Sequence, residues 1–309
     1  MKIFRYIVVL ILGSLFLAPS VFAITTEQEQ QFSYYWYAAR QALEEEQYDK
    51  ALVLLEFCQS IKPNDGQTLA FLGRIYEKAG EHERALATYR AAFEADPYDQ
   101  WLPYSKKLLN SEEDADAKQT IAVLEKAYST QKGGVKDKKV DENLLNTMLS
   151  MYLHVESWKK ALAIQDELDR QKGYDAYSAL TRYRIYAMWD KPKQAIAAIN
   201  KYLELDPNDV RFLMFRLELM EKTGAKVQEL YAMYDRILEL TPLNLMVLNN
   251  YAYHLATHGG DLKKAERMSA VTIREDTNNP VYLDTYGWIL HMQGQDELAL
   301  FFQTYSLMS

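Results

Sequence analysis

Apolar side chains recur at intervals of three and four residues along residues 66–99, in two runs that are separated by a glycine. That spacing places the side chains of each run on one helical face, so the pattern predicts two amphipathic helices joined by a turn. Small residues at Gly73 and Ala85 would let the two helices approach closely. Pro97 marks the end of the second helix. The two apolar faces consist of Leu69, Leu72 and Tyr76, and of Ala85, Tyr89 and Ala92.

The same pattern recurs along most of the chain at a step of 34 residues. Four pairs of alanines and prolines keep this step, which indicates an internal repeat. Residues 100–141 blur the pattern and end in a basic, glycine-containing linker. The pairs are Ala51 and Ala85, Pro63 and Pro97, Ala161 and Ala195, and Ala265 and Ala299.

The unit at 66–99 resembles the tetratricopeptide repeat in its Leu-Gly-Tyr first helix, its Ala-Tyr-Ala second helix and its terminal proline. The resemblance implies an all-α fold, a right-handed superhelical solenoid of about eight helical hairpins with a degenerate third one. Residues 249–299 also resemble the C-terminal units of exported tetratricopeptide proteins from Gram-negative bacteria. That second resemblance implies a place in the cell envelope.

The N-terminus has the layout of a secretory signal peptide. Lys2 and Arg5 lead into an apolar run over 6–17, Pro19 interrupts the run, and a small residue stands at Ala23. Cleavage there would leave a periplasmic protein with no stable insertion in the membrane. The alternative is an uncleaved N-terminal helix that anchors the chain in the membrane.

The pattern therefore divides the chain into four segments. They are a signal peptide over 1–23, N-terminal repeat units over 24–99, a degenerate unit with its linker over 100–141, and a C-terminal repeat array over 142–309. No segment outside the repeats is long enough for a separate catalytic domain.

Composition and charge narrow the classes of function. Hydrophobic residues make up 49% of the 309 residues and charged residues 25%, which is typical of a folded protein. The net charge of −8 argues against nonspecific binding to nucleic acid or to an anionic membrane. Cys58 is the only cysteine, so the chain cannot form an internal disulfide.

The sequence contains no arrangement that is typical of catalysis. It has no glycine-rich phosphate loop and no nucleophile motif, and its carboxylates are scattered. His254 and His258 lie four residues apart on one predicted helix, but Gly259 follows at once, and a helix end explains the pair better than a metal does. We therefore expect a protein that is not an enzyme and that has neither a metal nor a cofactor.

The resemblance implies a concave groove lined by the first helix of each hairpin, where side chains are free to contact a protein or peptide partner. Asn249 has the strongest case, because a polar residue beside Tyr251 on an apolar helix requires a reason. Asparagine can pair with peptide amides, arginine with carboxylates, and aromatic side chains can act as anchors. Trp36 and Trp288 could equally pack between units, and the arginines could be solvated. The expected groove residues are Trp36, Arg40, Arg74, Asn146, Tyr177, Arg184, Asn249, Tyr253 and Trp288.

The last predicted helix, over 296–309, is unusually apolar for the end of a solenoid, which normally has a polar outer face. Either the chain is truncated or a partner covers this helix. The sequence thus predicts a non-catalytic interaction scaffold or adaptor in the cell envelope. The alternative is a structural assembly factor that acts by self-association or docking through the C-terminal helix.

Overall fold

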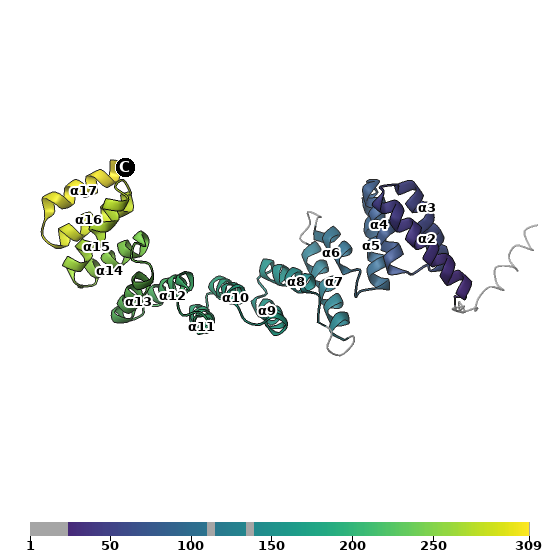
Figure 1. The fold of residues 1–309 in the computed structure, drawn as a ribbon, viewed down its shortest axis with the longest axis horizontal. Coiled ribbons are helices and arrows are strands. Elements are labelled where there is room, and N and C mark those ends of the chain that lie inside the picture. The colour runs from purple at the N-terminus through teal and green to yellow at the C-terminus, as the bar shows by residue number, and fades with distance from the viewer. Residues whose placement is uncertain (1–23, 110–114, 134–138, 309) are drawn as a thin grey trace, which may run out of the picture. The chain divides into compact units, whose positions relative to one another are not determined.

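The computed structural model describes residues 24–109, 115–133 and 139–308. Over these residues the chain forms sixteen helices, α2 to α17, and no strand (Figure 1). The expectation of an all-α fold is therefore confirmed. The predicted signal peptide over 1–23 and two parts of the segment 100–141, at 110–114 and 134–138, lie outside the described residues.

The chain divides into two compact units, Met1–Met151 and Tyr152–Ser309. In the first unit α2 packs on α3, α4 on α5, and α6 on α7, so that consecutive helices form hairpins (Figure 1). The helices of this unit are α2 (Thr26–Glu44), α3 (Tyr48–Ile61), α4 (Gly66–Lys78), α5 (His82–Ala95), α6 (Trp101–Leu109), α7 (Ala115–Lys132) and α8 (Glu142–His154), the last of which crosses into the second unit.

In the second unit each helix from α9 onward packs on the next, and α14 also packs on α16. The first helices of two successive hairpins are thus neighbours, as a tetratricopeptide solenoid requires. The helices are α9 (Trp158–Lys172), α10 (Ala176–Met188), α11 (Pro192–Leu203), α12 (Val210–Lys222), α13 (Val227–Leu240), α14 (Leu245–Thr257), α15 (Leu262–Glu275), α16 (Pro280–Met292) and α17 (Asp296–Met308).

Polar side chains cap the start of several helices, and glycines follow the end of several. The Asn244 side chain accepts a hydrogen bond from the Val247 N–H (3.2 Å) at the start of α14, and Asn279 does the same for Val281 at the start of α16. These bonds satisfy N–H groups that lack a partner within the helix. Gly259, with φ of 70°, follows α14 in a left-handed conformation that glycine adopts without strain.

The blurred third segment still forms a helical pair, but its first helix, α6, has only nine residues. Buried Gln131 on α7 links the residues before α6 to those before α8 through hydrogen bonds. Its Nε2 donates to the carbonyl of Tyr98 (2.9 Å), and its Oε1 accepts from the N–H of Asp141 (2.8 Å). A buried amide that is bonded at both ends replaces part of the apolar packing that the regular repeats use.

The closest helix contact of the first unit centres on Gly73. A Cβ atom at this position would lie 2.7 Å from the ring of Tyr89, so α4 and α5 pack as tightly as they do only because residue 73 has no side chain. The Tyr89 hydroxyl donates to Glu77 (2.9 Å), and this bond holds the ring in place. The small residues expected at this contact from the sequence therefore have the predicted role.

Cys58 lies on α3 and is fully buried. Burial, with a smaller contribution from the charge of Asp65, raises the pKa of the thiol to about 11. Because the thiolate is the reactive form, we expect a maleimide to label Cys58 only as the protein unfolds. The labelling rate across a urea series should follow the loss of helical circular dichroism. Fast labelling of the native protein would contradict the packing of α2 on α3.

Candidate partner-binding groove

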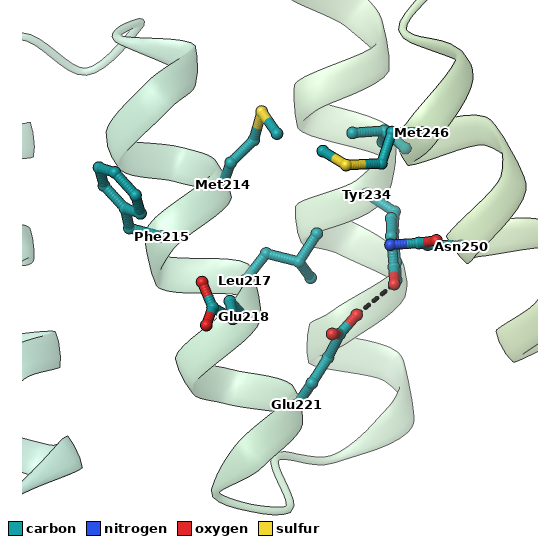
Figure 2. Close-up of a pocket in the computed structure, with 9 residues that line it drawn as sticks. Met214, Phe215, Leu217, Glu218, Glu221, Tyr234, Met246 and Asn250 are labelled. Carbon is teal, nitrogen blue, oxygen red and sulfur yellow. Dashed lines mark hydrogen bonds between the residues drawn. The ribbon is translucent and has the colours of Figure 1, made fainter. Parts of the chain in front are cut away.

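Two adjoining cavities lie on the first helices of consecutive hairpins in the second unit. The first has a volume of about 290 Å³ and lies between α12 and α14, and the second has about 360 Å³ and extends to α16. They share Glu221, Tyr234 and Asn250, so we treat them together as the groove. Figure 2 shows the first cavity. Its volume is at the small end of the range of about 300–1,000 Å³ that is typical of ligand pockets.

Helical spacing explains why these side chains converge. Residues three, four and seven apart share one face of a helix, and each of the three helices presents one such stripe to the groove. The adjoining parts of these helices pack in the core through residues such as Leu213, Tyr251 and Ile289. The stripes are Met214, Leu217, Glu218 and Glu221 on α12, Met246, Asn249, Asn250 and Tyr253 on α14, and Val281, Asp284 and Thr285 on α16.

One end of the groove is apolar. Met214 and Met246 point toward each other from α12 and α14 (Figure 2), and Phe215, Leu217 and Val247 complete this end. Met246 leaves 49% of its surface exposed, which is more than a core methionine does. Methionine side chains are flexible and polarizable, and for that reason they are frequent on surfaces that adapt to different apolar partners.

The centre of the groove, where the two cavities meet, is polar and is built around Glu221. The Tyr234 hydroxyl donates to Glu221 (Figure 2), and Nε2 of His254 lies 3.4 Å from the same oxygen. Burial opposes ionisation of Glu221, but the hydrogen bonds from His254 and Tyr234 outweigh it and lower the pKa of this carboxyl. Burial and the neighbouring Glu221 together raise the pKa of Tyr234. A carboxylate and a neutral phenol therefore lie at the centre of the groove.

The floor of the groove is rigid. The fully buried ring of Tyr234 stacks on that of Tyr251, with centroids 4.8 Å apart and planes within 7°. Lys264 fixes the position of Tyr251, because its ammonium group donates one hydrogen bond to the Tyr251 hydroxyl (2.8 Å) and another to Asp235 (2.9 Å). Aromatic pairs with this geometry stabilise the fold by about 0.5–1.5 kcal/mol beyond their buried area.

Asn249 is the most unusual residue of the site. It lines the second cavity, it is only 4% exposed, and its Oδ1 has no hydrogen-bond partner among the described residues. A buried polar atom without a partner costs about 1–3 kcal/mol and is rare in native proteins. Nδ1 of His254, on the same helix, is also buried without a partner there. Both atoms belong to residues that line the second cavity, so a ligand in the groove could bond to them.

Of the nine residues expected in the groove, Asn249 and Tyr253 line it together. Trp288 and Tyr177 are exposed elsewhere in the second unit, and Trp288 lies beside His291 (ring centroids 5.6 Å apart). Arg184 and Asn146 are also exposed. Whether they contact a partner stays a prediction.

The other three expected residues belong to the first unit, as Asn146 does. Trp36 lies against Phe71, with ring centroids 5.8 Å apart, and is half-buried. Arg40 pairs with Glu44 one turn further along α2 (3.2 Å), and Arg74 is exposed on α4. Their role in binding also stays a prediction.

Sequence reasoning missed the whole contribution of α12. None of the nine expected groove residues lies on this helix, so Met214, Glu218 and Glu221 were not predicted. The spacing of Glu218 and Glu221 among apolar residues was the available signal, since it places two acids on one face of a largely buried helix.

The described residues contain no group of three or more His, Cys, Asp or Glu side chains arranged to hold a metal ion. The rings of His254 and His258 do share a helix face, where they stack with centroids 4.9 Å apart. None of the helices within 24–109, 115–133 and 139–308 combines the length and apolarity that a membrane crossing requires.

Comparison with known proteins supports a tetratricopeptide-repeat architecture. The sequence profile of the tetratricopeptide repeat matches residues 42–102. A lipopolysaccharide assembly protein B from Haemophilus influenzae is 25% identical over 175 residues, which cover 55% of this chain and 43% of that protein. The structure of Naa15/Naa10 bound to HypK-THB superposes with a TM-score of 0.67 at 13% identity, over 92% of this chain and 42% of that one.

The chain is a tetratricopeptide-repeat protein, as the repeat profile, the 34-residue step and the paired helices together show. It spans about two fifths of the length of the two proteins described above. Proteins with this fold are typically non-catalytic, and the fold supports a role as a scaffold for protein–protein interaction. The number of hairpins and the handedness of the superhelix stay predictions.

Proposed function

We propose that this protein is a non-catalytic scaffold in the bacterial cell envelope that binds a peptide segment or a partner protein in the groove on α12, α14 and α16. The observation that carries the proposal is Asn249, a buried side chain that lines the groove and whose Oδ1 has no partner. Its carbonyl oxygen can accept a hydrogen bond from a backbone N–H of a bound segment. Tyr253, which is 48% exposed beside it, supplies an aromatic anchor.

The test of this role is the double variant Asn249→Ala, Tyr253→Ala. Partner proteins captured from an envelope fraction by the immobilised chain should fall at least tenfold, because hot-spot residues each contribute about 1–2 kcal/mol or more. Arg267→Ala is the matched control. This exposed side chain lies on α15, the second helix of its hairpin, and does not line the groove. Equal capture by the double variant and the wild type would contradict the proposal.

The variant Asn249→Ala separates a binding role from a structural one. It removes a buried acceptor that has no partner among the described residues, and alanine has the higher helix propensity. The free energy of unfolding should therefore stay the same or rise while capture falls, as expected where function opposes stability. A large loss of stability would show that Asn249 serves the fold instead.

The envelope location rests on the predicted signal peptide over 1–23 and on the name of the H. influenzae relative. An alkaline phosphatase fusion to the C-terminus should be active in a Gram-negative host, because that reporter forms its disulfides only outside the cytoplasm. A mature chain that begins near Ile24 would distinguish cleavage from an uncleaved anchor. An intact but inactive fusion would contradict export.

A second candidate function is assembly through self-association of α17. This helix exposes 65% of Leu300, 62% of Phe301 and 88% of Leu307, and single helices rarely leave such a run of apolar side chains in water. Light scattering should then show a dimer that Phe301→Asp converts to a monomer. A wild-type chain that is monomeric at all concentrations would exclude this function.

A further inference from the structure

We propose that the groove selects peptide segments in which a lysine or arginine lies next to a large aliphatic side chain such as leucine, isoleucine or methionine. This inference rests on the proposed binding function of the groove and adds the chemistry of the partner. Two kinds of surface meet in the groove, an apolar one at Met214 and Met246 and an acidic one at Glu218, Glu221 and Asp284. Each recognises one of the two kinds of side chain.

The fixed charges of the lining are carboxylates, and His254, which also lines the second cavity, is the one titratable base among the lining residues. The residues that line the two cavities include three carboxylates, Glu218, Glu221 and Asp284, and neither lysine nor arginine. Glu218 and Asp284 are exposed, on α12 and α16, so a bound cation can reach them from either side of α14. A cavity with walls of one sign concentrates its field and attracts ions of the opposite sign.

The bonds inside the groove leave this negative charge in place. Glu221 accepts from the neutral phenol of Tyr234 and lies 3.4 Å from His254 Nε2, and neither contact involves a lysine or an arginine. Lys264 lies on α15, and its ammonium group already bonds to Asp235 and Tyr251. A cationic side chain of a partner would therefore find carboxylate oxygens with remaining acceptor capacity.

Asn249 gives independent support that a donor belongs in this place. Its Oδ1 is buried, accepts no hydrogen bond from any described residue, and belongs to a side chain that lines the same cavity as Glu221 and Asp284. An ammonium or guanidinium group carries several donors, so one cation could serve both the amide oxygen and a carboxylate. A backbone N–H of the bound segment can also donate to Asn249, so this residue calls for a donor, and the carboxylates select the cation.

The apolar cavity adjoins the acidic one through Glu221, Tyr234 and Asn250, which line both. An apolar side chain and a cationic one can fill them together only if they lie close in the partner's sequence. Met214 and Met246 can rearrange around leucine, isoleucine or methionine, so the cavity fixes the class of side chain more than its shape. The expected partner is thus a basic and apolar peptide segment.

The experiment is selection of random peptides displayed on phage, with the full chain immobilised. Peptides whose binding is lost in the Tyr253→Ala variant define the groove-dependent set. We expect this set to be enriched in lysine or arginine beside leucine, isoleucine or methionine, and depleted in aspartate and glutamate. The recovered peptides, made synthetically, should bind more weakly as salt is raised, because the charges involved are partly exposed.

Charge-neutral variants provide the quantitative test with those same synthetic peptides. Glu218→Gln and Asp284→Asn should each weaken binding by up to about fivefold, the range for solvent-exposed ion pairs. Glu229→Gln on α13 is the matched control, because this exposed acid does not line the groove and should leave affinity unchanged. Neutral variants that bind as tightly as the wild type would overturn the inference.

The outcomes separate this inference from the function on which it rests. Groove-dependent peptides without an excess of lysine or arginine would overturn the charge selectivity and leave the groove as a binding site. Peptides that all bind equally well to the Tyr253→Ala and Asn249→Ala variants, or an absence of binding peptides, would overturn both proposals.

Discussion

Replacing Gly73 with leucine should lower the free energy of unfolding of the first unit by about 2–3 kcal/mol. A Cβ atom at this position lies 2.7 Å from two carbons of the Tyr89 ring, and the ring is buried and held by Glu77. Leucine has the better helix propensity, by about 0.8 kcal/mol, but α4 and α5 must separate to accept it. Urea denaturation followed by circular dichroism measures the difference.

The matched control for Gly73→Leu is Ala87→Leu on α5. Ala87 is exposed, so the same side chain added there should change stability by less than about 0.5 kcal/mol. If Gly73→Leu were as stable as Ala87→Leu, the close contact between α4 and α5 would be wrong. The partial rescue of Gly73→Leu by Tyr89→Ala would identify the ring as the obstacle.

Replacing Tyr234 with alanine should have the largest effect on the second unit, a loss of about 3–5 kcal/mol. Tyr234 is fully buried, stacks on Tyr251, and gives Glu221 a hydrogen bond. Alanine leaves a cavity beneath the groove and leaves a half-buried carboxylate with one partner fewer. The variant Tyr234→Phe keeps the ring and should cost about 1.5–3 kcal/mol, the range for a hydrogen bond to a charged group. Equal losses for the two variants would contradict this division.

The cost of Tyr234→Phe should depend on pH through Glu221. The pKa of Glu221 is lower in the folded protein than in the unfolded chain, so its contribution is complete above the ordinary value of about 4.3. It is lost as the pH falls through the lowered folded pKa. The stability gap between the wild type and Tyr234→Phe should therefore be widest near neutral pH and narrow on acidification. A gap that stays constant down to about pH 3 would show that the phenol does not act through the carboxylate.

The helices could be predicted from the sequence because the evidence for them is local and repeated. Apolar residues at intervals of three and four, with small residues such as glycine and alanine at close contacts, specify both a helix and the face that packs. The α4–α5 contact at Gly73 shows this directly. The third hairpin was harder, because Gln131 ties it to Tyr98 and Asp141 by bonds that leave no periodic trace.

The groove could be predicted only in part. Asn249 stood out because a polar residue on an apolar helix is expensive unless it has a purpose. Met214 and Met246 did not, since an apolar residue in a cavity and one in the core look alike in sequence. Glu221 is important because it contacts Tyr234 and His254, which lie on two other helices. The spacing of residues along the chain does not predict these contacts.

The groove also explains how one helical face can serve both fold and function. The buried sides of α12, α13 and α14 stabilise the unit through Leu213, Tyr234 and Tyr251, and the adjoining residues are free to vary with the partner. A rigid floor reduces the ordering cost of binding, because its side chains are already fixed by stacking and hydrogen bonds. The flexible methionines at one end then provide adaptation where a partner's side chains differ.

The most direct measurement is photo-cross-linking in the cell, with a benzophenone amino acid placed at Tyr253 in the full chain. Our account predicts discrete cross-linked products from this position that disappear when Asn249→Ala is added, and none of these products from the same probe at Arg267 on α15. Identical products from both positions, or products at Tyr253 that survive Asn249→Ala undiminished, would contradict the claim that this groove is where the protein holds its partner.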